Sequence, residues 1–212
     1  MSRFWLPRRL AAGIAVVAAL CIGGGAAAQS LRGTSPATTV PLSLDSNARA
    51  CADCAVRLDV SDAAIARCTR ALREEARNPP NLVVTYINRG NIRMARGEFL
   101  DALEDFDASI GLDPRNAEAR LNRGVALIAL ERYGLAIAAL TEAVSLGVHE
   151  PHKAYYNRAA AREALGDLRG ALEAYSTALE IQPDWGAASA DTQRLVRSRQ
   201  ERLAQALEES DP

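Results

Sequence analysis

The 212-residue sequence has few of the side chains that most catalytic sites require. Histidine occurs only twice, as His149 and His152 in one short segment. No nucleophile, base and orienting acid stand in an arrangement typical of covalent catalysis. The glycines lie at predicted helix turns and form no phosphate-binding loop. The sequence therefore predicts a protein that is not an enzyme and that has no cofactor.

An excess of positive charge is also missing. The chain has 25 basic and 26 acidic residues, which give a net charge of −1. Three of the basic residues and none of the acidic ones lie in the first 28 positions, so the remainder has a net charge of −4. A nucleic-acid surface needs clustered positive charge. The sequence therefore argues against a nucleic-acid partner and favours a protein or peptide partner.

Long apolar runs are missing except near the N-terminus. Three arginines in the first nine residues precede an apolar run over 10–22, and small residues follow at Ala26–Ala28. This order is typical of a secretory signal peptide, which we expect over 1–28. The run is shorter than the roughly 18–20 residues that span a bilayer, although retention as an anchor is the alternative. We therefore expect an exported, periplasmic protein with no membrane insertion after cleavage.

A repeated tripeptide organises most of the remaining chain. Asn-Arg-Gly occurs at 88–90 and 122–124, and Asn-Arg-Ala follows at 157–159, so the intervals are 34 and 35 residues. A period of this length predicts a solenoid of stacked supersecondary units. Apolar spacings of three and four residues predict that each unit is a pair of helices. The expected first helices are 83–96, 117–130 and 152–165.

The expected second helices share one pattern. Each opens on an alanine, which a large apolar residue follows four positions later. The alanines are Ala102, Ala136 and Ala171, and the large residues are Phe106, Leu140 and Tyr175. We expect the small residues Gly90, Gly124 and Ala159 to meet these alanines where the paired helices cross. Pro114 and Pro183 then end two of the second helices.

This pattern of glycine, alanine, aromatic residue and proline resembles the tetratricopeptide repeat. The resemblance covers three units, at 83–116, 117–151 and 152–183, and the second is weakest because Glu131 and Val148 replace the usual glycine and proline. It implies an all-α, right-handed superhelical solenoid of stacked antiparallel helix hairpins. A flexible leader over 29–44 and a degenerate hairpin over 45–82 would precede the repeats. A C-terminal capping helix over 184–212 would follow them.

Three cysteines follow the expected cleavage site. Export predicts that Cys68 forms a disulfide across the degenerate hairpin. Two antiparallel helices that turn near Asp59 place Cys51 opposite Cys68, whereas a Cys54–Cys68 pair is more like the cysteine pair of similar exported bacterial proteins. The remaining thiol is either free or joins two chains into a homo-oligomer. A redox role for the Cys51–Cys54 motif is disfavoured because no strand leads into it.

The sequence His149-Glu150-Pro151-His152 contains the best candidate metal ligands. Pro151 predicts an extended backbone, in which these side chains need not converge. An exposed loop without a metal is therefore the favoured interpretation.

The resemblance implies that the first helices line a concave groove. Asn88, Asn122 and Asn157 would recur there, and an amide group can pair with a peptide backbone of any sequence. The alternative is that these asparagines bond neighbouring helices. The residues expected to line the groove are Ile87, Asn88, Asn91, Leu121, Asn122, Val125, Tyr156, Asn157 and Ala160. A carboxylate-clamp subset of the family has a basic residue at the positions of Ile87 and Leu121, and this difference argues against binding of chaperone tails.

Arginine occupies a position that is commonly leucine in the family, at Arg89, Arg123 and Arg158. We expect these side chains to form a ladder with acids of neighbouring repeats. The function expected from the whole sequence is a periplasmic scaffold that binds a short protein segment. The alternatives are a structural subunit of a cell-envelope assembly, or a protein that handles thiols or metals.

Overall fold

The computed structural model describes residues 47–74 and 79–210, and within them the fold is entirely helical. The expected signal peptide and flexible leader lie outside these residues. The helices are α3 (Asn47–Val56), α4 (Asp62–Glu74), α5 (Pro79–Arg96), α6 (Phe99–Leu112), α7 (Ala117–Ala129), α8 (Tyr133–Ser145), α9 (Pro151–Ala164), α10 (Leu168–Ile181) and α11 (Gly186–Ser210). None of the described helices is long and apolar enough to cross a membrane.

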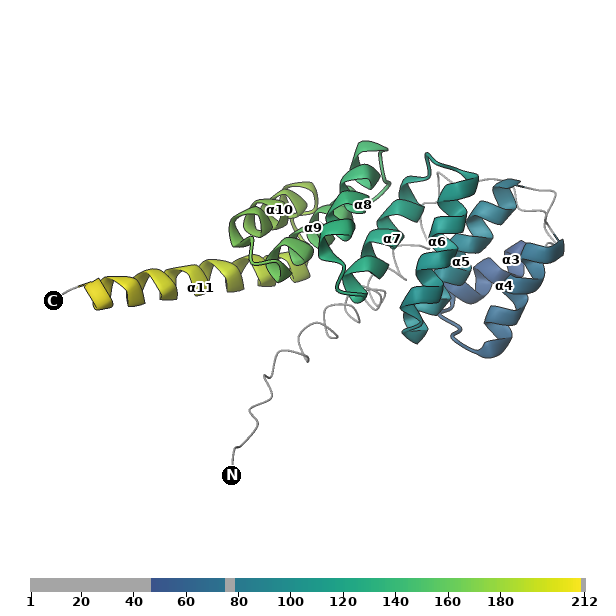
Figure 1. Ribbon diagram of the computed structural model, residues 1–212, viewed down its shortest axis with the longest axis horizontal. Helices are drawn as coiled ribbons and strands as arrows, with labels where there is room; N and C mark the ends of the chain where they lie inside the picture. Colours follow the sequence, from purple (N-terminus) through teal and green to yellow (C-terminus); the bar gives the residue numbers. More distant parts are fainter. Residues whose placement is uncertain (1–46, 75–78, 211–212) are drawn as a thin grey trace, which may run out of the picture.

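The helices form a row of antiparallel pairs that follow one another in chain order (Figure 1). The pairs are α3–α4, α5–α6, α7–α8 and α9–α10, and each pair packs against the next. The first helices of the three repeats, α5, α7 and α9, match the expected helices closely at their C-terminal ends. The fold is therefore an all-α helical repeat.

The turns within the repeats share one backbone geometry. Gly97, Glu131 and Gly166 follow α5, α7 and α9 with φ values of 78°, 58° and 82°. The next residue in each case donates its N–H to a carbonyl five residues earlier, as Glu98 does to Arg93 at 2.9 Å. This is the Schellman ending of a helix, which needs a left-handed residue. The turn therefore keeps its shape even where glutamate replaces glycine.

The glycines of the first helices lie closest to the large residues of the second helices. A Cβ atom on Gly90 would lie 2.5 Å from the ring of Phe106, and one on Gly124 would lie 2.6 Å from Leu140. The space beside each glycine is therefore filled by the large side chain of the second helix. The small residue makes room for a ring or an isobutyl group, which fills the centre of the helix pair.

Two proline segments also differ from the sequence expectation. Pro79 and Pro80 lie in the first turn of α5 and not in a connection before it, so α5 begins four residues earlier than expected. Pro151 similarly begins α9. Proline is compatible with the first turn of a helix because its missing N–H would have no partner there.

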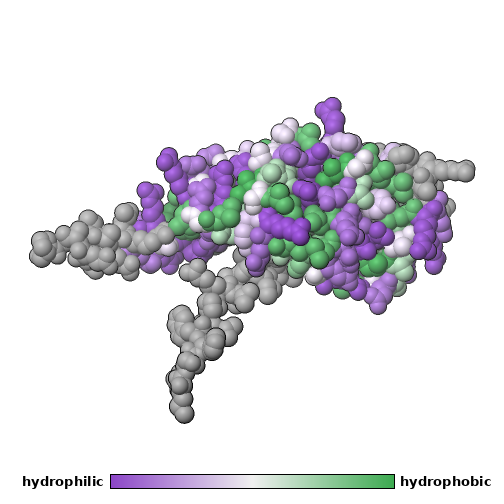
Figure 2. Space-filling view, in the orientation of Figure 1, coloured by the Kyte–Doolittle hydropathy of each residue, from purple (hydrophilic) through white to green (hydrophobic). Residues whose placement is uncertain are grey.

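The capping helix α11 packs its N-terminal part against the last repeat and then runs beyond it (Figure 1). Ala188 and Leu195 are buried there, whereas Val196 is exposed. On the face shown in Figure 2, apolar side chains reach the surface in small areas separated by hydrophilic ones.

Candidate protein-interaction surface

The residues expected to line the groove lie on α5, α7 and α9, but they differ in exposure. Asn91 is exposed. The partly exposed residues are Ile87, Asn88, Asn122, Val125 and Ala160. The buried residues are Leu121, Tyr156 and Asn157, with exposed fractions of 7%, 4% and 3%. The surface open to a partner therefore centres on α5 and α7, and the lining by all nine residues stays a prediction.

The three asparagines form no hydrogen bond through their side chains with any described residue. In addition, Nδ2 of Asn88 and Oδ1 of Asn157 are shielded from solvent without a hydrogen-bond partner in the described part of the chain. A buried polar atom left unpaired costs about 1–3 kcal/mol. The alternative interpretation, in which these amides hold neighbouring helices together, finds no support in the described contacts.

Tyr156 belongs to the capping contact rather than to an open groove. Its hydroxyl donates to a carboxylate oxygen of Asp191 on α11 at 2.7 Å. Its ring lies 4.7 Å from that of Trp185 and 5.3 Å from that of Tyr175, measured between centroids. Burial and the bond to Asp191 raise the pKa of Tyr156, so the hydroxyl remains a donor. The sequence pattern placed Tyr156 in the groove because it did not indicate how far α11 reaches back.

A second set of contacts closes the same end of the molecule. Arg194 on α11 bonds Glu163 on α9 at 2.7 Å and Asp191 at 3.1 Å. Glu163 also accepts from the hydroxyl of Tyr175 at 3.2 Å. These bonds raise the pKa of Arg194. The last repeat is therefore joined to α11 by both ring contacts and ion pairs.

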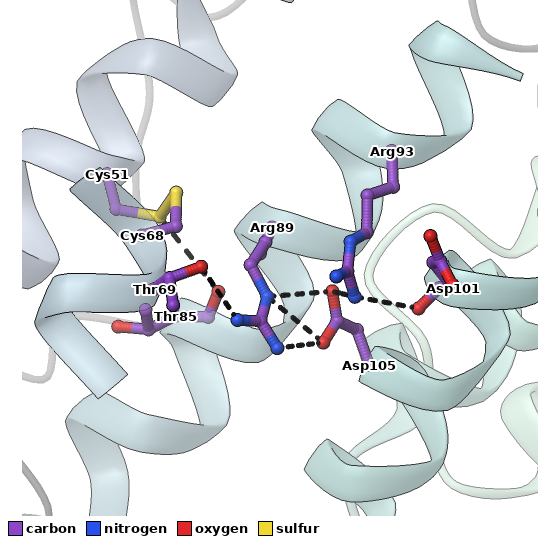
Figure 3. A network of polar contacts seen from close by, with 8 residues as sticks. All are labelled: Cys51, Cys68, Thr69, Thr85, Arg89, Arg93, Asp101 and Asp105. Carbon is purple, nitrogen blue, oxygen red and sulfur yellow. Dashed lines mark hydrogen bonds and ion pairs between the residues drawn. A yellow bond between two sulfur atoms is a disulfide. The ribbon is translucent and has the colours of Figure 1, made fainter. Parts of the chain in front are cut away.

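The arginine ladder is only partly as expected. Arg89 bonds Asp105 of its own repeat at 2.6 Å, together with Thr69 of the preceding hairpin at 3.0 Å (Figure 3). Arg123 bonds Asp107 of the preceding repeat at 2.6 Å. Arg158 has no acid partner among the described residues, and its guanidinium lies 4.6 Å from the ring centroid of Tyr155. One of the three pairs is thus between repeats, one is within a repeat, and one is missing.

The disulfide joins Cys51 on α3 to Cys68 on α4, which resolves the choice of partner (Figure 3). Cys54 is free and 4% exposed. Its burial argues against a disulfide between two chains. Cys51 and Cys54 lie on one helix without a preceding strand among the described residues, and they are not bonded to each other. The disulfide therefore has a structural role, because it joins the two helices of the first hairpin.

The histidine segment is not an exposed loop throughout. His152 lies in the first turn of α9, and its ring contacts that of Trp185 edge-on at 4.9 Å. Burial lowers the pKa of His152, which favours the neutral ring. The described residues contain no group of three or more side chains placed to hold a metal ion. Because Pro151 begins α9, His152 lies on a helix and packs against Trp185, and does not lie in an extended segment.

The fold and these contacts agree with what known proteins show. Two models described as tetratricopeptide repeat match residues 87–151 and 152–184. The chain is a tetratricopeptide-repeat protein. Its matched models and structures are protein-binding modules and not enzymes.

Two curated relatives share the repeats. RNA polymerase II-associated protein 3 of Xenopus tropicalis is 38% identical over 93 residues, which are 44% of this chain and 14% of that protein. Serine/threonine-protein phosphatase 5 of Homo sapiens is 36% identical over 86 residues, which are 41% of this chain and 17% of that protein. The tetratricopeptide-repeat chain therefore spans less than a fifth of the length of these relatives.

Two solved structures have the same repeat fold. The first tetratricopeptide repeat domain of Spaghetti, bound to the HSP90 peptide SRMEEVD, has a TM-score of 0.52 and 27% identity and covers 55% of this chain and 91% of that one. MamA has a TM-score of 0.61 and 26% identity and covers 70% of this chain and 84% of that one. Repeat domains of this fold thus include one that holds a peptide, which supports a role in protein interaction.

Proposed function

We propose that this protein binds a short segment of a partner protein on the surface of α5 and α7, outside the cytoplasm. The observation that carries the proposal is that Asn88 and Asn122, at one repeat position, are both partly exposed and pair with no described residue through their side chains. Amide groups in a preformed row can donate to and accept from an extended backbone. Because the helices already hold them in place, little ordering is needed on binding.

The apolar neighbours of the asparagines define the chemistry of the segment. Ile87 and Val125 are partly exposed beside Asn88 and Asn122. A basic residue at the position of Ile87 would favour a carboxylate, whereas an isoleucine favours an apolar side chain. The proposed ligand is therefore a short segment with apolar side chains, recognised through its backbone. This differs from the acidic peptide SRMEEVD in the similar structure of Spaghetti.

The location proposed outside the cytoplasm is supported by two features. The N-terminal sequence has the order of a signal peptide, and the first hairpin has a disulfide between Cys51 and Cys68. Disulfides persist mainly in oxidising compartments. The N-terminal sequence of the mature protein, isolated from a Gram-negative host, should begin at Gln29.

Site-specific photo-crosslinking tests the binding surface. A photoreactive residue at the exposed position of Asn91 should trap one defined partner protein in the periplasm. The same residue at Thr177, on the second helix α10, should not trap it.

Adding Asn88→Ala and Asn122→Ala should reduce the crosslink about tenfold or more, because two charge-neutral hydrogen bonds contribute about 1–3 kcal/mol together. A matched control is Thr141→Ala, because that hydroxyl bonds only its own helix. Equal crosslinking in the asparagine variant and the parent would reject the proposal.

A further inference from the structure

One repeat position carries an arginine that faces the second helices. Arg89 and Arg123 each precede a glycine that receives the large side chain of the second helix, and Arg158 precedes Ala159 at the equivalent position. Arg89 reaches both Thr69 on α4 and Asp105 on α6. Arg123 likewise reaches Asp107 on α6, so two of the three arginines contact a second helix. A contact made there is separate from the surface proposed above.

In the first repeat, two arginines share one carboxylate (Figure 3). Arg89 and Arg93 contact Asp105 at 2.6 and 2.8 Å, and Asp105 is 2% exposed. Arg93 also donates to the carbonyl of Asp101 at 3.0 Å. Tyr86 lies beneath Arg89, with 5.6 Å between the ring centroid and the guanidinium carbon. Two cations, one carboxylate and one aromatic ring thus form a compact group.

The third repeat has the same group without the carboxylate. The residues 69 positions later are Arg158, Arg162 and Tyr155, and the aspartate is replaced by Ala174. Arg162 donates to the carbonyl of Gly170 at 3.1 Å, as Arg93 does to the equivalent Asp101. Arg158 lies over Tyr155 at 4.6 Å, as Arg89 lies over Tyr86. The two arginines are therefore placed as in the first repeat, with no acid between them.

Within the described residues, Arg158 has no acidic partner, and the ion pair of Arg162 is long. Nε of Arg158 is shielded from solvent and has no hydrogen-bond partner in the described part of the chain. Arg162 lies 3.9 Å from Asp167, whose side chain is 54% exposed. Burial and the neighbouring charge of Arg162 lower the pKa of Arg158. Two close guanidinium groups in a partly buried place favour an anion from outside.

The second repeat shows that this feature is specific to the third. Leu127 occupies the position of Arg93 and Arg162, so the second repeat has one arginine there and not two. Its Arg123 is paired with Asp107 at 2.6 Å. The arginine at this helix position thus has an acidic partner in the first two repeats, and in the third it has none among the described residues.

We propose that Arg158 and Arg162 form an anion site beside Ala174, which binds a carboxylate of an acidic segment of a partner protein. The ligand is a carboxylate because Asp105 shows that this geometry of two guanidinium groups accepts one. The site lies on the side of α9 that faces the second helices, so a partner held by the asparagine row would need a separate acidic segment to reach it.

Nuclear magnetic resonance of the arginine Nε–Hε groups in the full mature chain tests the site. Addition of pentaglutamate should shift the Arg158 signal saturably, whereas pentalysine or sodium chloride at equal ionic strength should not. Arg158→Leu should lower the affinity for pentaglutamate about tenfold. The matched variant Arg123→Leu should leave it unchanged. Equal shifts with sodium chloride, unchanged affinity in Arg158→Leu, or tighter binding of inorganic phosphate than of pentaglutamate would overturn the proposal.

A second variant supplies the missing carboxylate within the chain. Ala174→Asp recreates the residue that Asp105 provides in the first repeat, so it should raise the urea midpoint and abolish the pentaglutamate shift. Ala139→Asp is the matched control, because Ala139 is the equivalent buried residue of the second repeat and has Leu127 in place of an arginine. It should lower the midpoint. Destabilisation of both variants to the same extent would show that the third repeat has no place for a carboxylate.

Discussion

At the scale of residues, Glu131 has a left-handed backbone conformation that glycine adopts at the equivalent position of the other two repeats. Glu131 ends α7 with φ of 58°, where Gly97 and Gly166 have 78° and 82°. The left-handed region costs an L-residue with a Cβ about 1–2 kcal/mol, whereas glycine enters it freely. The hydrogen bond from Arg132 to Leu127 at 2.8 Å keeps the turn in place. The second repeat therefore has a strained residue that the other two repeats avoid.

Replacing this residue should stabilise the protein. Glu131→Gly should raise the free energy of unfolding by about 0.5–1 kcal/mol, because relief of the left-handed strain exceeds the added freedom of the unfolded chain. Urea denaturation followed by circular dichroism measures the change. The reciprocal control is Gly166→Ala, where an added Cβ has nothing within 4 Å and only the φ of 82° opposes it. That variant should lose about 1 kcal/mol. A less stable Glu131→Gly protein would contradict the argument.

At the scale of elements, the N-terminal hairpin of α3 and α4 is held differently from the repeats. Its buried residues are mainly alanines and the three cysteines, so it has little side-chain volume to bury. The disulfide of Cys51 and Cys68 closes a loop with a sequence separation of 17. In the chain-entropy description, closing a loop of this size stabilises the folded state by roughly 3 kcal/mol. The covalent bond thus replaces packing that the repeats obtain from Phe106 or Tyr175.

Removal of the disulfide should therefore destabilise this hairpin. The double variant Cys51→Ala, Cys68→Ala should lose about 2–4 kcal/mol of unfolding free energy. A reducing agent should lower the urea midpoint of the parent and leave that of the double variant unchanged. Cys54→Ala is the control, because Cys54 is free. It should remain sensitive to the reducing agent. A parent midpoint that does not respond to reduction would show that the bond does not stabilise the fold.

The sequence predicted the helices of the repeats well because their period and apolar spacing are local signals. It placed the start of α5 four residues too late, because Pro79 lies in the first turn of the helix. It placed the start of α9 within one residue, although Pro151 predicted an extended backbone. The candidate surface was harder to predict. The burial of Tyr156 depends on Asp191, which is 35 residues away in α11. The pairing of Arg89 depends on Asp105, and no repeat pattern indicates an acid at a position that is alanine in the other two repeats.

At the scale of the whole molecule, the array has two unlike ends. One end is the disulfide-bonded hairpin, and the other is closed by α11 (Figure 1). Ala188 and Leu195 of α11 pack in one cluster with Tyr156, Tyr175 and Trp185. Each repeat buries its apolar face only against its neighbours, so a terminal repeat needs a cap. The cap here is specific, because Asp191 and Arg194 bond groups of the last repeat.

Deletion of residues 186–212 should expose this cluster. We expect the melting temperature to fall by about 6–12 °C, which corresponds to about 3 kcal/mol for a chain of this size. Differential scanning calorimetry measures the shift, and light scattering should show association through the uncovered rings. The control variant is Val196→Ser, because that side chain is 38% exposed on the same helix. It should melt within about 2 °C of the parent. An unchanged melting temperature after the deletion would show that α11 does not cap the array.

The shared carboxylate of the first repeat has a consequence for how such an array can grow. A duplicated copy of residues 83–116 would bring its own aspartate for its two arginines and add no unbalanced charge to the interior. A duplicated copy of residues 152–183 would bring two more guanidinium groups and no acid between them. We therefore expect electrostatic repulsion to oppose lengthening by duplication of the third repeat more than duplication of the first.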